Sequence, residues 1–149
     1  AVAKKKHLDV TFYQKDITKK LPFKNNTFHK IVSSLVFSHL KNITKPLKES
    51  YRVLKKGGKL IITDFPWGST LDWKSIKYRK NPNFFPDVSK TCSFHSISEY
   101  VDKVSIIGFK IKEIIPLRVT PRAKKYLTKK AYEKNKEKFG SVIYIFEKI

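Results

Sequence analysis

Glycine is scarce in this chain of 149 residues, which contains only five glycines. Gly57 and Gly58 are adjacent, and no two glycines are separated by a single residue. A G-x-G turn lets the backbone approach a bound nucleotide cofactor closely. The printed sequence therefore has no turn of this kind.

Cysteine and long apolar runs are also scarce. The one cysteine, Cys92, cannot form an internal disulfide, which fits a reducing cytoplasm. The longest apolar runs, at 60–62 and 142–146, fall far short of the roughly 20 residues that span a bilayer. The first residues are basic and lead into a polar segment, unlike a signal peptide. We therefore expect a cytoplasmic protein without membrane contact.

Acidic residues are few, with 12 Asp and Glu against 33 Lys and Arg, so the net charge is +21. Such a charge attracts nucleic acid or another polyanion. A generally lysine-rich or heat-adapted surface is the alternative, although heat adaptation usually raises glutamate as well. Only four of the basic residues are arginine, the residue that reads bases best. Any binding of nucleic acid is therefore predicted to be non-specific.

The length and the 13% aromatic content predict one domain, 1–149, with one modest core. Apolar periodicity predicts alternating strands and helices, hence an α/β fold with a mostly parallel sheet. The strands are expected at 8–16, 31–34 (short and buried), 59–65, 109–119 and 141–149. The helices are expected at 44–56, 96–108 and 121–140.

Helix boundaries are predicted from capping residues. Thr44 is expected to cap the first helix, and Gly57 to end it in a left-handed conformation. Ser96 and Glu99 form a capping-box pattern at the start of the second helix, and Gly108 is expected to end it. Gly140 is expected to end the third, basic helix.

A series of short motifs occurs in a fixed order. It comprises Asp16, the LPF at 21–23, Phe28, His39, the RVLK at 52–55 with Gly57-Gly58, and Asp64. Their order and spacing resemble the class I S-adenosylmethionine-dependent methyltransferases, of the type 11-like group, from the family's third strand onward. The resemblance implies a Rossmann-like sheet of about five strands with flanking helices. That sheet would be incomplete in its N-terminal half, because the family's first two strands, with the glycine-rich turn and a ribose-binding acid, are absent.

The resemblance also implies cofactor-binding residues. Asp16 would accept a hydrogen bond from the adenine amino group, and Ile17 would pack against the ring. Ser33, Ser34 and Leu35 would line the methionine end, mainly through backbone carbonyls. The alternatives are an aspartate that caps an ordinary turn, and small residues at a crowded strand end.

Candidate catalytic residues follow the next strand ends. His39 occupies the position of the family's frequent histidine and would act as a base or orient the substrate. Asp64 would take a proton, and Trp67 would face the substrate. The alternatives are a structural histidine and a turn-capping aspartate. His95 is expected only to form part of a helix entry. No metal site is predicted, since no C-x-x-C or H-x-x-x-H spacing occurs.

Two functions remain open. The first is methyl transfer from S-adenosylmethionine to an unknown acceptor, and the second is a non-catalytic module that binds nucleic acid or a protein through its basic surface. Because the glycine-rich turn is absent, the chain alone is expected to hold the cofactor weakly. The family's front half lies outside the printed sequence, has been shed, or is supplied by a second chain. The strand at 8–16 would then pair beside 31–34 or with a second copy, and a homodimer formed near 8–37 is expected.

Overall fold

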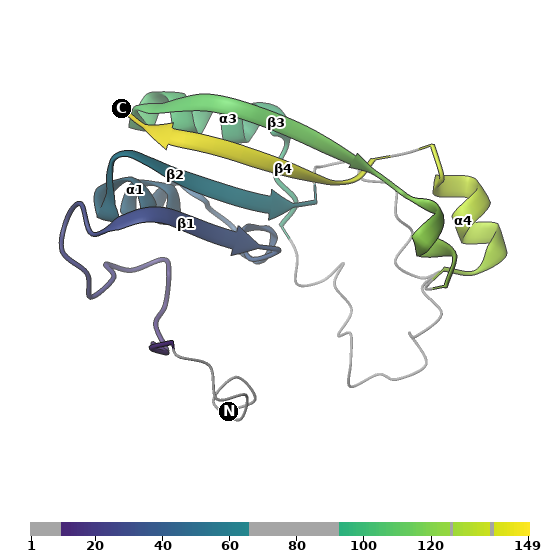
Figure 1. Ribbon diagram of the computed structural model, residues 1–149, viewed down its shortest axis with the longest axis horizontal. Helices are drawn as coiled ribbons and strands as arrows, with labels where there is room; N and C mark the ends of the chain where they lie inside the picture. The colour runs from purple at the N-terminus through teal and green to yellow at the C-terminus, as the bar shows by residue number, and fades with distance from the viewer. Residues whose placement is uncertain (1–9, 66–92, 126, 138) are drawn as a thin grey trace.

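The computed structural model describes residues 10–65, 93–125, 127–137 and 139–149. Within these ranges the chain forms one sheet of four strands, in the order β1-β2-β4-β3 (Figure 1). The strands are β1 (Phe28–Ser34), β2 (Leu54–Asp64), β3 (Phe109–Arg118) and β4 (Phe139–Lys148). These four strands correspond to four of the five strands that the sequence predicts. The predicted strand at 8–16 is the one that is missing from the described residues.

The sheet is mixed. Strand β1 pairs in parallel with β2, whereas β4 is antiparallel to both β2 and β3. Three strands therefore run in one direction, and β4, which lies between two of them, runs in the other. The sequence predicted a mostly parallel sheet. Three of the four strands do run in the same direction, but only one of the three pairings between neighbouring strands is parallel.

The predicted strand at 8–16 is wrong for the residues that the structure describes. Residues 10–15 have no regular secondary structure, and the side chains of Val10, Phe12 and Tyr13 are about half exposed. An alternating sequence becomes a strand only when a neighbour supplies backbone hydrogen bonds and covers its apolar face. The segment is held instead by ring contacts, with Tyr13 edge-on to Phe23 at 5.2 Å.

Strand β1 was expected to be buried, and this is also wrong. In the described residues it forms the edge of the sheet, and the side chain of Val32 is 70% exposed. Along its outer side, the backbone N–H and C=O groups of β1 have no strand partner among the described residues. The apolar edge is a surface on which another strand could pair.

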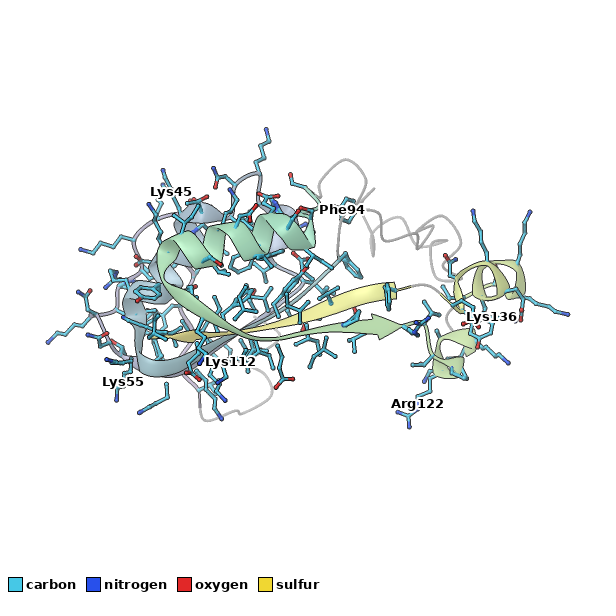
Figure 2. All side chains as sticks on the ribbon, turned by 90° about the horizontal axis from the view of Figure 1, so that it is seen from above. Lys45, Lys55, Phe94, Lys112, Arg122 and Lys136 are labelled. Carbon is cyan, nitrogen blue, oxygen red and sulfur yellow. The ribbon has the colours of Figure 1, made fainter. Side chains whose placement is uncertain are left out.

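Two helices, α1 (Thr44–Val53) and α3 (Ile97–Ile107), cover one face of the sheet (Figure 2). Alternate residues of β2 and β4 point toward these helices and are buried, in keeping with the two-residue period of a strand. Each buried aliphatic or aromatic side chain contributes about 1.5–3 kcal/mol. The core consists mainly of Leu47, Leu60, Ile62, Tyr100, Val104, Tyr144 and Phe146.

The cap of α3 is confirmed, and that of α1 is not. The Ser96 hydroxyl accepts a hydrogen bond from the Glu99 amide at 3.0 Å, and Gly108 ends the helix at φ 106°. At α1, however, the N-cap position is held by Ile43, which has no side-chain oxygen, and Thr44 is the first residue of the helix. Asn42, one residue before the N-cap, accepts the Thr44 amide through Oδ1 at 2.8 Å.

Helix α1 passes into β2 without an intervening loop, because Val53 ends the helix and Leu54 begins the strand. Gly57 therefore lies inside β2 instead of ending the helix, and its φ of 74° coincides with an irregularity in the β1–β2 register. The Lys148 ammonium fixes the junction by donating to the carbonyls of Tyr51 and Leu54, both at 2.8 Å.

The predicted helix at 121–140 is wrong. The segment forms a 3-10 helix η5 (Pro121–Lys125) and a short α4 (Lys129–Asn135), and β4 begins at Phe139, so Gly140 lies in that strand. A continuous helix of 20 residues would extend about 30 Å and would need an apolar stripe. Among the described residues of this segment, the buried apolar side chains are those of Leu127 and Tyr132, in a small cluster separate from the main core.

Candidate functional site

The carboxyl ends of β1 and β2 lie side by side and carry most of the predicted site residues. Ser33 and Ser34 pair in register with Ile62 and Thr63, and the Leu35 amide donates to the Thr63 carbonyl at 2.8 Å. Leu35 has a φ of 54°, in the left-handed region that a branched side chain rarely adopts. The sheet thus brings four predicted site residues together at the carboxyl ends of its strands, where α/β proteins commonly bind ligands. They are Ser33, Ser34, Leu35 and Asp64.

Asp64 ends β2, but its side chain is completely buried. Its Oδ2 accepts a 2.6 Å hydrogen bond from the Tyr100 hydroxyl, and its Oδ1 accepts the Phe65 amide at 2.9 Å. Burial, followed by the Asp64 charge, raises the pKa of the Tyr100 phenol well above its ordinary value, so the phenol stays a donor. These contacts join α3 to the sheet, which supports a structural role for Asp64.

Two hydroxyl groups in the buried core have no hydrogen-bond partner among the described residues, those of Ser38 and Tyr144. Tyr144 stacks on Tyr100, with ring centroids 4.4 Å apart. Burial, and next the Asp64 charge, raises the pKa of Tyr144. Buried polar groups normally find a partner, so these two hydroxyls are exceptions within the described core.

The two candidate histidines differ. His39 ends the short 3-10 helix η2 (Phe37–His39) after β1, and its side chain is exposed. His95 is buried: Nδ1 lies 3.0 Å from Glu99 Oε2, and Nε2 lies 2.8 Å from the Leu40 carbonyl. His95 therefore anchors the entry of α3, as expected. Trp67 and Cys92 lie outside the described residues.

Asp16 and Ile17 lie in an exposed turn instead of at a strand end. Asp16 Oδ1 accepts the Thr18 amide at 2.9 Å and the Thr18 hydroxyl at 2.7 Å. These hydrogen bonds, led by that from the hydroxyl, lower the pKa of Asp16. The geometry is that of the turn-capping alternative, and the carboxylate is engaged within its own turn.

The sequence analysis missed the residues that hold the segment after this turn, 21–25, against the fold. Arg52 of α1 donates through Nη1 to the Phe23 carbonyl and to Asn25 Oδ1, both at 2.8 Å, and through Nε to Glu49 at 2.9 Å. Glu49 in turn accepts the Leu21 amide at 2.6 Å. The signal was present, since Glu49 and Arg52 are three residues apart on one helical face.

Comparisons with known proteins agree with this architecture. Residues 1–62 match the model of the Methyltransferase domain family. The ubiquinone/menaquinone biosynthesis C-methyltransferase UbiE of Agrobacterium fabrum is 38% identical over 63 residues, which cover 42% of this chain and 24% of that protein. An uncharacterised protein of Methanocaldococcus jannaschii is 31% identical over 90 residues, covering 60% of this chain and 42% of its own length. The matches thus cover well under half of these relatives.

Solved structures agree over almost the whole chain. An S-adenosylmethionine-dependent methyltransferase from Thermotoga maritima superposes with a TM-score of 0.70 at 25% identity, covering 99% of this chain and 68% of that one. Another from Mesorhizobium loti gives a TM-score of 0.70 at 13% identity, covering 98% and 74%. The family match, the relatives and the fold agree: residues 1–62 resemble the Methyltransferase domain family, and the chain has the fold of the class I S-adenosylmethionine-dependent methyltransferases.

Proposed function

We propose that the chain is part of an enzyme that transfers a methyl group from S-adenosylmethionine to an acceptor. The observation that carries the proposal is the fold, with the sheet order β1-β2-β4-β3, which superposes on a methyltransferase structure over 99% of the chain with a TM-score of 0.70. The UbiE relatives, which are C-methyltransferases by name, support the same reaction. Methyl transfer itself asks mainly for in-line positioning of the methyl carbon, with a base where the acceptor carries a proton.

The described residues fit the cofactor only in part. Ser33 and Ser34 end β1, and Leu35 follows them with the unusual φ of 54°. Asp16, however, is engaged with Thr18, and no glycine-rich turn is present to accommodate the methionine end. We therefore propose backbone contacts at 33–35 and assign no further step to this incomplete site.

His39 is the better of the two proposed catalytic residues. Its imidazole is exposed, five residues after the end of β1. A base has to reach the acceptor, and an exposed imidazole is accessible to one. Asp64 has no exposed atoms and already accepts two hydrogen bonds, so proton transfer would require it to give up the Tyr100 hydroxyl.

Titration with S-adenosylhomocysteine tests the proposal. We expect weak binding by calorimetry, with amide NMR shifts that concentrate at 33–35. A Ser34→Pro variant, which removes one amide and constrains the strand end, should weaken binding, whereas Ser105→Ala on the exposed side of α3 should not. Shifts that avoid 33–35 would contradict the proposed cofactor position. Tight binding by this chain alone would show that the glycine-rich turn is dispensable.

Partners and location are further parts of the proposal. One structural neighbour, at 17% identity and a TM-score of 0.70, is the methyltransferase in a complex with the Haloferax volcanii Trm112 activator. That precedent and the exposed β1 edge favour completion by another chain, and a homodimer through 8–37 is the version we propose. A cytoplasmic location is supported by the single cysteine. None of the described helices is both long and apolar enough to cross a membrane.

A second function, non-specific binding of nucleic acid, is favoured by one observation, the net charge of +21. Lysine supplies nearly all of that charge, and lysine contacts phosphates as a point charge. Gel-shift titrations of oligonucleotides should show binding that weakens steeply with salt and hardly depends on sequence. Strong discrimination between sequences in competition would contradict it.

A further inference from the structure

An open groove of about 580 Å³ lies between the turn that follows Asp16 and one face of α1. Lys19 and Lys20 line it from the turn, and Lys45 and Lys48 line it from the helix. Lys45 is labelled in Figure 2. The Glu49–Arg52 pair completes the lining. Small-molecule pockets are mostly apolar with a few polar groups. Six of the seven residues that line this groove bear a charged group at the end of an aliphatic stem, and four of the six are lysines, which favours an anionic ligand.

The Glu49–Arg52 pair forms a neutral and rigid part of this groove. The Arg52 guanidinium donates to Glu49, to the Phe23 carbonyl and to Asn25, so its hydrogen-bonding fork is occupied. Glu49 accepts from Arg52 and from the Leu21 amide. These contacts tie residues 21–25 to α1, and this segment directly follows Lys19 and Lys20.

The four lysines leave an unbalanced positive charge. Lys45 and Lys48 make no ion pair or hydrogen bond within the described residues, and Lys19 has only a 3.9 Å ion pair with Asp16, between two largely exposed side chains. Such exposed pairs contribute little. Lys20 lies near Glu49, whose charge Arg52 already balances. The groove therefore attracts anions from both walls.

We propose that this groove binds the phosphodiester backbone of nucleic acid. The inference rests on the second proposed function and gives it a location. Lysine ammonium groups meet phosphate oxygens without reading bases, and the one arginine in the groove is not available for bidentate base contacts. The groove is open, as a continuous strand requires, and the overall charge favours approach of a polyanion.

Two matched triple variants test the location. The groove variant is K20E/K45E/K48E, and the control is K129E/K130E/K134E on α4, which changes the net charge equally. Both are measured by fluorescence anisotropy with a labelled single-stranded oligonucleotide of mixed sequence, between about 50 and 200 mM salt. Circular dichroism and thermal unfolding check the fold, and the matching Lys→Gln triples replace any variant that does not fold.

We expect the groove variant to lose about 100-fold in affinity near 0.1 M salt, with a salt slope shallower by about 2, from three phosphate contacts at about 0.7 each. The control should lose less than about fivefold, because charges beyond a Debye length are screened. Equal losses would overturn the groove as the site but leave nucleic-acid binding standing. No binding by the unaltered chain would overturn both. Competition by inorganic tripolyphosphate as strong, per phosphate, as by the oligonucleotide would overturn the assignment to a nucleic-acid backbone.

Discussion

The hydroxyl of Tyr100 lies 2.6 Å from Oδ2 of Asp64, in a region where neither side chain is exposed. The hydrogen bond connects α3 with the end of β2, two elements separated by a long stretch of sequence. A charged acceptor in a water-excluded site makes this a strong hydrogen bond, and a costly one to lose.

Tyr100→Phe should therefore lower the free energy of unfolding by about 1.5–3 kcal/mol, because Asp64 would keep only the Phe65 amide. Urea unfolding measures the change. Tyr51→Phe is the control, since the Tyr51 hydroxyl makes only a 3.2 Å contact with the Ile149 carbonyl. An equal effect of the two substitutions would contradict a special role for the Tyr100–Asp64 bond.

Arg52→Lys should loosen the segment that Arg52 holds, because an ammonium group cannot replace a fork that contacts Glu49, Phe23 and Asn25 together. We expect a loss of about 1–2 kcal/mol and faster hydrogen exchange at the Leu21 amide. Arg122→Lys in η5 should change neither quantity. Unaltered exchange at Leu21 would show that the segment is held by other contacts.

Acid should weaken the same anchor. The hydrogen bond from Arg52 is the largest cause that lowers the pKa of Glu49 below its ordinary 4.5. A carboxylate whose pKa is lower in the folded state stabilises the fold above its unfolded pKa, and this stabilisation is lost as the pH falls through the folded value.

Glu49→Gln should thus be less stable than the unaltered protein near pH 7, and the difference should shrink as the pH falls below 4.5. Urea unfolding across a pH series measures it. Glu113→Gln removes a carboxylate that makes no ion pair with a described residue, and its curve should run parallel to that of the unaltered protein. A Glu49→Gln difference that is constant with pH would contradict the ion pair.

The exposed edge at Val32 should support self-association. Light scattering is expected to give a dimer, and Val32→Lys should shift it toward monomer, because a charge on an apolar edge opposes strand pairing. Ile106→Lys is the matched control, since Ile106 is 84% exposed but lies on α3, away from this edge. A monomer at high concentration for the unaltered chain would refute the dimer.

Added salt should stabilise the basic segment that contains η5 and α4. Lysines outnumber the acids Glu133 and Glu137 there, and one of these acids, Glu133, pairs with Lys136 at 2.8 Å. Added salt screens the remaining repulsion, so amide exchange at 129–135 should slow, while exchange in α3 changes little. A rate of amide hydrogen exchange in α4 that does not change with ionic strength would contradict this explanation.

Sequence reasoning worked where local signals and burial agree. The Ser96 cap, the Gly108 terminus and the alternation of Leu60 and Ile62 specify their elements through nearby residues. It failed where the outcome depends on a distant partner. The alternation at 8–16 suits a strand, but the described residues supply none to pair with it, and the basic run after Pro121 has helix-forming residues but little apolar surface to bury.

The candidate site shows the same division. Ser33, Ser34 and Leu35 were placed correctly at a strand end, because strand direction follows from the alternation of elements. The burial of Asp64 depends on Tyr100, 36 residues further along, and the groove depends on contacts from Arg52 to a turn about 30 residues earlier. Pairings over such separations leave little trace in one sequence.

Because α1 ends at Val53 and β2 begins at Leu54, no loop separates the helix from the strand. The rotation of α1 about its axis is therefore coupled to the position of β2. A helix turns by about 100° per residue, so one residue inserted at this junction would rotate α1 by that angle. Lys45 and Lys48 would then leave the groove, although no lysine had been substituted. The charge pattern of this surface is thus set by the length of a connection as much as by composition, and a relative with equal lysine content but one added residue there would lack the groove.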